Sequence, residues 1–570
     1  MALPRQQTAT GANYNVCFRR RRVSSPRSVF FGRGVASHRN SCLSIPSTGA
    51  STATRNISLR ASREEGSNSN VGESPEVEIT AMANTDSSEP LLAKASSRDI
   101  DYIRTAFLFF FPALGGLLFG FDIGATSGAI VSLTSLTTSG TDWGPALSDF
   151  QVGSVVSSSL FGALVGSVGA FFVGDKLGRK KELLLAAGLY GLGAGIASTA
   201  ADYPLLMAGR GLYGLAIGFA MHAAPAYIAE TAPAKLRGLL ISLKEAFIVG
   251  GILLGYLGSY FLVDASAGWR GMYGIAIPIA VAFGIGMLLL PESPRWLMLS
   301  GAGEDPARKA LQDCRGNVDG RDAMIEADLK AMADTVQVNG SGSAVDFSKL
   351  LEKKNAKPLY IGLSLMFFQQ ITGQPSVLYY AAKIFQDAGF AGEQAATGVS
   401  VVLGGFKLLM TSVAAFSVDS LGRRPLLLWG VSGIVVSLIT LGSVQTVLSG
   451  GAVGPIVWVN VVALLLYVGC YQISFGPVSW LLVGEVFPLE VRGQAAALAT
   501  FVNFGTNFLV SLVLPVLQSG LGLGNTYFVF SILGMAAVFS IFATVPETKG
   551  KTLEEIEALW SEEDAEKGGV

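Results

Sequence analysis

A carboxylate inside an apolar stretch is the first feature of this sequence that could carry chemistry. Asp122 lies in the run FGFDIG (residues 119–124), about 17 residues after the stretch begins near Thr105. On a helix that distance is roughly 25 Å, which places the carboxylate deep in the membrane if the helix spans it. An ionisable group at such depth is costly, so its presence indicates a function.

A second set of polar residues consists of side-chain amides in two other apolar stretches. Gln369 and Gln370 are adjacent in the run QQITGQ, which ends with Gln374. Asn503 and Asn507 are four residues apart, so they share one face of a helix. Adjacent amides deep in apolar sequence favour the binding of a polar solute. For Asn507, a hydrogen bond between two helices explains the amide nearly as well.

Metal, nucleic-acid and enzyme chemistry find little support in the sequence. The chain has two histidines and four cysteines that form no CxxC pair, which nearly excludes a histidine-based metal site. Its net charge is −1, so no large basic surface is available for nucleic acid. No nucleophile–base set or phosphate loop lies outside the apolar stretches. His222 could assist proton transfer, although a neutral, hydrogen-bonded packing residue is the simpler explanation.

The apolar stretches predict an all-α membrane protein. Only 15% of the residues are charged, whereas a soluble chain would carry about 25%. Runs of about 20 apolar residues, each long enough to cross a bilayer, recur twelve times. They cover residues 105–131, 150–173, 182–200, 203–229, 238–263, 270–290, 358–385, 395–418, 425–447, 455–484, 494–518 and 524–545.

Basic residues are concentrated in the loops on one side of the expected helices. The opposite loops have little beyond Arg270 and Lys383. By the positive-inside bias, both termini and the central segment face the cytosol or its equivalent, the stroma in a plastid. The basic loops hold Lys176, Arg179, Lys180, Lys181, Lys235, Arg237, Arg423, Arg424 and Arg492.

The first hundred residues differ in composition from the rest of the chain. Residues 1–63 contain eleven arginines, ten serines and no acidic residue or lysine, which is typical of an organelle transit peptide. The serine content favours a plastid over a mitochondrion, and a disordered basic tail is the alternative. Residues 64–100 are polar and acidic, and predict a disordered linker.

The remaining chain divides into two groups of six stretches that repeat one another. We expect one half over 101–290, a central helical segment over 291–357, a second half over 358–547 and an acidic tail over 548–570. Glu230-(x6)-Arg237 recurs as Glu485-(x6)-Arg492, and PES (291–293) recurs as PET (546–548), both at an offset of 255 residues. DKLGRK (175–180) recurs as DSLGRR (419–424), offset by 244 residues. Two related six-helix units predict a transporter with alternating access to a site between them.

Together these motifs resemble the sugar-porter family of the major facilitator superfamily. The resemblance also rests on PESPR (291–295), RGLYG (210–214) and PETKG (546–550), and it covers about residues 100–555. Among its members, the chain is most similar to plant proton-coupled xylose and glucose porter-like proteins of the plastid and vacuole. The resemblance implies a proton-coupled carrier of monosaccharides, with the proton as coupling ion and no cofactor.

The family also implies roles for the charged residues. Asp122 matches the proton acceptor of the symporters, and Arg210 in the fourth span matches its partner. Pairing and release of the two would couple protonation to conformation, whereas a fixed Asp122–Arg210 brace is the alternative. The loop charges are expected to form ion pairs that latch the two halves in the outward-open state, beside the alternative that they only set topology. This latch set comprises Asp175, Arg179, Glu230, Arg237, Asp419, Arg423, Glu485 and Arg492.

A sugar site is expected at mid-membrane. Sugars need amides and hydroxyls for their hydroxyl groups and an aromatic ring for their C–H face, and Trp480 matches the stacking tryptophan of the family. Gly373 and Pro375 weaken the seventh span, which allows it to bend as a gate beside Tyr379 and Tyr380. The expected sugar ligands are Gln369, Gln370, Gln374, Trp480, Asn503, Glu245 and Lys407.

Three positions depart from the family pattern. Glu245 stands where the fifth span usually offers a glutamine, Lys407 where the eighth offers an asparagine, and Pro375 where the seventh has another asparagine. Spans 5 and 8 face each other in this fold, and opposite charges deep in the membrane should be paired. We therefore expect a Glu245–Lys407 ion pair that borders the sugar site.

Several functions fit the sequence. A proton-coupled monosaccharide carrier is favoured, but a uniporter, an exchanger or a disaccharide carrier has the same fold. A sugar sensor is a third possibility, although sensors carry longer signalling tails than this one. The resemblance places a monomeric chain in the bilayer of the plastid inner envelope, with the vacuolar membrane as alternative. Neither the sugar nor the direction of transport follows from the sequence.

Overall fold

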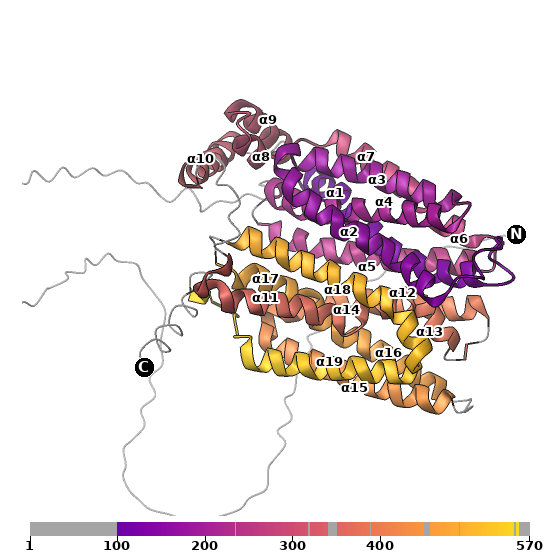
Figure 1. Ribbon diagram of the computed structural model, residues 1–570. Helices are drawn as coiled ribbons and strands as arrows, with labels where there is room; N and C mark the ends of the chain where they lie inside the picture. Colours follow the sequence, from indigo (N-terminus) through magenta and orange to yellow (C-terminus); the bar gives the residue numbers. More distant parts are fainter. Residues whose placement is uncertain are drawn as a thin grey trace, which may run out of the picture. The chain divides into compact units, whose positions relative to one another are not determined.

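Nineteen α-helices make up the part of the chain that the structure describes (Figure 1). The computed structural model describes residues 100–233, 235–316, 318, 320–339, 350–387, 389–390, 392–449, 456–488, 491–551 and 555–557. The expected transit peptide (1–63) lies outside the described residues, as does the expected linker except for residue 100. Most of the expected acidic tail (548–570) lies outside them too.

The first half contains six spans whose bounds agree with the expected ones to within a few residues. The sixth span is divided at Ile275. Side-chain hydrogen bonds mark where helices of this half begin. Ser148 and Gln151, for example, form a capping box at the start of the second helix. The helices are α1 (Tyr102–Thr134), α2 (Asp149–Leu177), α3 (Arg179–Thr199), α4 (Tyr203–Thr231), α5 (Arg237–Leu262), α6 (Gly268–Gly274) and α7 (Ala276–Leu289).

The second half begins with a span that is broken into three helices. Gly373 has a φ of 88°, which ends the first helix of that span, and Pro375 lies at the start of the next. The broken span consists of α11 (Lys353–Ile371), α12 (Gln374–Tyr379) and α13 (Ala381–Asp387). The other helices are α14 (Glu393–Leu421), α15 (Arg423–Ser449), α16 (Ile456–Ile473), α17 (Phe475–Val486), α18 (Arg492–Leu521) and α19 (Leu523–Thr544).

The described helices account for twelve membrane crossings. Eleven stretches are long and apolar enough to span a membrane, counting α6 with α7 and α16 with α17 as one stretch each. The broken α11–α12–α13 span supplies the twelfth. The fold is therefore the expected all-α membrane protein with two six-helix halves.

The two halves meet mainly along two helix pairs, α2 with α18 and α5 with α14, and α1 also contacts α12 and α13. In Figure 1 the indigo-to-magenta helices of the first half and the orange-to-yellow helices of the second form two adjoining layers. Gly153 of α2 lies against Leu512, and Gly404 of α14 lies against Leu253 and Tyr256. These residues belong to the parts of their helices that are remote from the basic loops. The described contacts thus join the halves on the outer side and, where Phe161 of α2 meets Phe508 of α18, reach the middle of the helices.

Helices α1 and α5 pack with their backbones in contact. A Cβ atom at Gly120 would collide with the Ile248 carbonyl, and one at Gly124 would collide with the Ile252 carbonyl. Small residues allow this approach in membrane helices, where packing replaces the hydrophobic effect. The approach fixes the part of α1 that contains Asp122.

The central segment is helical, as expected, and its described part contains three helices. They are α8 (Pro294–Leu299), α9 (Glu304–Arg315) and α10 (Arg321–Asn339), and they gather at one end of the bundle in Figure 1. Arg104 Nε at the start of α1 donates to the Asp313 carbonyl at 2.6 Å. Cys314 is buried in the apolar core of the first half. The described part of α9 therefore packs onto the first half.

Candidate functional site

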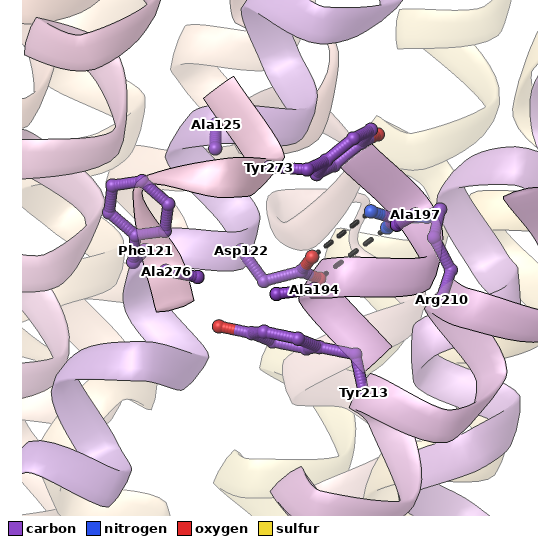
Figure 2. Close-up of a pocket in the computed structure, with 9 residues that line it drawn as sticks. All are labelled: Phe121, Asp122, Ala125, Ala194, Ala197, Arg210, Tyr213, Tyr273 and Ala276. Atoms are coloured by element: carbon purple, nitrogen blue, oxygen red, sulfur yellow. Dashed lines mark hydrogen bonds and ion pairs between the residues drawn. The ribbon is translucent and has the colours of Figure 1, made fainter. Parts of the chain in front are cut away.

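A buried ion pair joins α1 and α4 in the middle of the first half (Figure 2). Arg210 Nη1 donates to Asp122 Oδ1 at 3.0 Å, and Nη2 donates to Oδ2 at 3.4 Å. Asp122 is 4% exposed and Arg210 is 1% exposed. The pairing that the sequence predicts is thus present, although its role in proton transfer stays a proposal.

Neutral groups complete the surroundings of this pair. Ser159 of α2 donates to Asp122 Oδ2 at 2.8 Å, and the Thr126 hydroxyl lies 3.4 Å from Oδ1. Arg210 Nε also donates to the Val155 carbonyl of α2. All four lone-pair sites of the ionised carboxylate therefore have a donor. Sequence analysis did not single out Ser159, because it is one of three consecutive serines in an apolar stretch.

Aromatic rings border the ion pair within the first half. The Tyr273 ring centroid lies 5.1 Å from the Arg210 guanidinium carbon, and Tyr213 donates its hydroxyl to the Leu118 carbonyl at 2.8 Å. Both rings line a small cavity around Asp122 and Arg210, which Figure 2 shows. The cavity lies between α1, α3, α4 and the α6–α7 span.

The amide side chains gather in the second half, where they bond to one another. Asn503 Nδ2 donates to Gln369 Oε1 at 2.6 Å, and Gln369 Nε2 donates to the Phe475 carbonyl at 2.6 Å. Gln370 Nε2 lies 3.4 Å from Gln369 Oε1. Gln374 is 5% exposed, whereas Trp480 is 40% exposed. The structure brings Gln369, Gln370 and Asn503 together at the junction of α11, α18 and α17.

The expected ion pair between Glu245 and Lys407 is not formed, although the structure describes both residues. Lys407 Nζ donates to Gln472 Oε1 at 2.6 Å and lies 5.5 Å from the Tyr471 ring centroid. The physical reason for the difference is that α5 and α14 meet on the outer side, away from Glu245, which lies two turns from the basic loops.

The expected gate residues lie at the outer contact between the halves. Tyr380 donates its hydroxyl to the Ser511 carbonyl at 3.1 Å, within the second half. Tyr256 of α5 donates its hydroxyl to the Leu378 carbonyl at 2.7 Å, and the Ala382 amide donates to Ser127 of α1 at 3.1 Å. The segment that contains Tyr379 is therefore bound to the first half on both sides.

Charged residues of the latch set form ion pairs, and each described pair lies within one half. Arg179 lies 3.5 Å from Glu230 in the first half, and Arg423 lies 3.1 Å from Glu485 in the second. These pairs join the start of one helix to the end of its neighbour, and so they brace each half. A latch between the halves in the outward-open state stays a prediction. Arg179 also pairs with Asp175 at 2.9 Å.

The other latch residues have separate outcomes. Arg492 donates to the Phe487 carbonyl at 3.0 Å, also within its own half, and Arg237 is exposed. The side chain of Asp419 lies outside what the structure describes.

Two carboxylates that were not among the expected site residues complete these braces. Glu292 accepts from the backbone amide of Lys180 at 2.9 Å, and Glu547 accepts from those of Arg423 and Arg424 at 3.0 and 3.1 Å. Both carboxylates therefore cap the first turn of a helix, where negative charge is favourable. The repeated Pro-Glu-Ser and Pro-Glu-Thr motif contains both carboxylates and could have indicated their shared role.

His222 belongs to a separate pair near the basic side of the first half. Its Nδ1 lies 2.8 Å from Glu182 Oε1 of α3, and Glu182 is fully buried. His222 is thus hydrogen-bonded, as expected, but its side chain is exposed and its partner is a carboxylate. Asn507 accepts from Ser511 on its own helix at 3.2 Å.

Known proteins resemble the chain over most of its length. The model of a family described as "Sugar (and other) transporter" matches residues 108–560. The D-xylose-proton symporter-like 3, chloroplastic, of Arabidopsis thaliana is 49% identical over 82% of this chain and 84% of its own. The D-xylose transporter of Levilactobacillus brevis is 36% identical over 80% and 96%.

A solved structure shows the same fold. It is the major facilitator superfamily proton:xylose symporter XylE bound to 6-bromo-6-deoxy-D-glucose. It is 29% identical to this chain and has a TM-score of 0.64, covering 80% of this chain and 99% of its own. With a family model that covers nearly the whole membrane region, the chain belongs to the sugar (and other) transporter family, a group of transporters and not of enzymes.

Proposed function

We propose that this protein is a proton-coupled carrier of a monosaccharide such as xylose or glucose, working by alternating access. The observation that carries the proposal is the division of labour between the halves. A titratable carboxylate paired to an arginine lies in the first half, and a cluster of amides lies in the second. The names of the relatives, a D-xylose-proton symporter-like protein and a proton:xylose symporter, support this function.

The geometry suggests how a proton would change the carrier. Ionised Asp122 holds Arg210 and Ser159 together, and so joins α1, α4 and α2. Protonation removes the charge and weakens the bonds to Arg210, which keeps its bonds to the backbone of α2. The packing of α1 against α5 would then pass the change to the interface with α14. The amides would bind sugar hydroxyls once they exchange their mutual bonds for bonds to the solute.

The test is uptake into liposomes that contain the purified protein, with and without an imposed pH gradient. We expect the wild type to concentrate its sugar when the outside is acidic. Asp122→Asn should lose this accumulation and retain exchange of sugar between equal concentrations. If the variant still concentrates sugar, symport through Asp122 is refuted.

A uniporter or exchanger is the second candidate, and one observation favours it. The Asp122–Arg210 pair is almost completely buried and all of its carboxylate sites are bonded, as in a fixed brace. In that case the wild type would equilibrate sugar without responding to the pH gradient. The same experiment therefore separates the two functions.

We further propose that the carrier resides in the plastid inner envelope, with residues 1–63 as its transit peptide. The arginine-rich, acid-free composition of these residues and the chloroplastic relative support this location. A fusion of residues 1–100 to a fluorescent protein should accumulate in plastids. A signal from the vacuolar membrane for the full chain would contradict the proposal.

A further inference from the structure

A buried carboxylate and a partly exposed histidine are in contact at the basic end of the first half. Glu182 of α3 is fully buried, whereas the side chain of His222 of α4 is 36% exposed. His222 Nδ1 lies 2.8 Å from Glu182 Oε1. The other carboxylate oxygen, Oε2, has no hydrogen-bond partner among the residues that the structure describes. The contact with His222 is therefore the main stabilising interaction of this buried carboxylate.

The end of α2 covers the pair closely. Gly174 lies one turn before the end of that helix. A Cβ atom at Gly174 would lie 2.8 Å from Glu182 Oε2 and 2.9 Å from His222 Cε1. The missing side chain thus allows three helices, α2, α3 and α4, to pack around one carboxylate. Only the imidazole extends from this packing to the surface.

The charged groups nearest to the pair already have partners. Arg179, one turn before Glu182 on α3, pairs with Asp175 of α2 and with Glu230 of α4. The Lys180 ammonium donates to backbone carbonyls at the end of α7. The other charged or titratable groups at this end of the half are Arg104 of α1, Lys176 of α2, Lys181 of α3, Tyr227 of α4 and Glu292 after α7.

The pair occurs in one half only, unlike the braces beside it. Shifting Glu182 by the 244 residues that relate DKLGRK to DSLGRR gives Leu426. Shifting His222 by the 255 residues that relate Glu230 to Glu485 gives Pro477. The second half therefore builds the same helices with apolar residues at both positions. The six-helix fold does not require a carboxylate and a histidine here, which favours a role other than packing.

We propose that Glu182 and His222 form a second proton-binding site, which makes the rate of sugar exchange depend on the pH at the basic side. A proton that binds the neutral imidazole goes to Nε2, because Nδ1 already faces the carboxylate. The contact then changes from a neutral hydrogen bond to an ion pair, and the net charge of the pair changes from −1 to zero. This site is separate from the proposed coupling at Asp122 and does not require it.

The bound proton strengthens the attachment of α3 to α4. A charge-assisted hydrogen bond is stronger than a neutral one, and a buried carboxylate without a counter-charge is unfavourable. The attachment is thus strongest at low pH and weakens as the pH rises and the imidazolium loses its proton. Because α4 also carries Arg210, a looser α4 transmits the movement of the first half less well. Sugar exchange should therefore be slower at alkaline pH.

The stability test compares His222→Asn with Lys181→Gln, a control that removes an exposed charge next to Glu182 in the sequence. The asparagine amide takes about the place of Nδ1, so it remains a neutral donor but cannot bind the proton. In detergent, His222→Asn should lower the melting temperature by about 2–4 °C more at pH 5.5 than at pH 8. Lys181→Gln should shift it equally at both. Equal shifts in His222→Asn would indicate a neutral packing contact and overturn the proposal.

The transport test measures sugar counterflow in liposomes with the same pH on both sides. All variants carry Asp122→Asn, so that this carboxylate does not contribute to the pH profile. Asp122→Asn alone should exchange sugar about fivefold more slowly at pH 8 than at pH 5.5, the lower end of usual coupling between two sites. Adding His222→Asn or Glu182→Gln should make the rate nearly independent of pH, whereas adding Lys181→Gln should preserve the profile.

The outcomes separate this site from the proposed function. A flat profile in Asp122→Asn alone, or one that His222→Asn leaves unchanged, overturns the proposed regulation. Complete loss of exchange in Asp122→Asn would instead contradict the proposed function. The melting temperatures of the two single variants would then decide whether the proton site exists.

Discussion

Among the described residues, each half of the membrane region buries one cation, and the two cations have different partners. Arg210 in the first half is neutralised by Asp122 and further bonded to backbone carbonyls of α2. Lys407 in the second half contacts a neutral amide and an aromatic ring. The charge of Arg210 is neutralised within the protein. The charge of Lys407 is not neutralised by a bonded carboxylate, so it is available to an anionic or polar group that approaches it. The halves share an ancestry in sequence but have separate chemical tasks.

At the helix ends on the basic side, in contrast, the two halves are alike. There both halves keep the same brace, in which an arginine at the start of one helix pairs with a glutamate near the end of another. Glu230 is also bonded to Ser293, and Glu485 to Thr548. Because these braces lie within the halves, each half is suited to move as one rigid body.

The largest effect should follow from breaking the neutral pair of the first half. Arg210→Met leaves the Asp122 carboxylate buried without a counter-charge, which costs about 3–5 kcal/mol. We expect little folded protein by fluorescence-detected gel filtration. The double variant Asp122→Asn, Arg210→Met should recover most of the melting temperature. A single variant as stable as the wild type would show that the pair is not the neutral unit described here.

The corresponding change in the second half should have a much smaller effect on stability. Lys407→Met removes a charge that no carboxylate contacts, so we expect a change within about 1 kcal/mol in the free energy of unfolding. Transport should nevertheless decrease. If Glu245 approaches Lys407 when the inner side closes, Lys407→Met should rescue the transport defect of Glu245→Gln. Intact transport in both single variants would remove Lys407 and Glu245 from the mechanism.

The braces should respond alike in the two halves. Arg179→Ala and Arg423→Ala each remove a partly buried, charge-assisted bond, and each should cost about 1–2 kcal/mol. Thermal unfolding of the two variants in the same detergent measures the difference. A latch between the halves would instead change the transport rate without loss of stability, and that result would support the predicted latch.

The smallest effect concerns the packing of α9 on the first half. Burial raises the pKa of the Cys314 thiol to about 12. The thiolate fraction is therefore very small at pH 8 and should increase about tenfold per pH unit up to the pKa. Alkylation followed by mass spectrometry should show slow modification at pH 8, and fast modification after denaturation. Fast labelling of the native protein would mean that α9 separates from the first half.

The sequence predicts the twelve spans well because an apolar run of fixed length has few alternatives in a bilayer. It also indicates the break in the seventh span, since Gly373 and Pro375 favour no continuous helix. The partner of Lys407 could not be predicted, because Glu245 and Gln472 are both plausible and the tilt of the halves decides between them. Likewise, the repeated motifs identify Arg179 and Glu230 but do not tell whether their bond lies within a half or between halves.

The glycine contacts between α1 and α5 have a mechanical consequence. Where two backbones touch, neither helix can slide or rotate against the other without a steric clash. A shift of α1 at Asp122 must therefore move α5 by the same amount. The event at a single carboxylate is thereby converted into a displacement of the surface that α5 presents to α14. Replacing Gly120 with alanine would separate α1 from α5 at this contact, so that a proton could bind Asp122 without displacing α5.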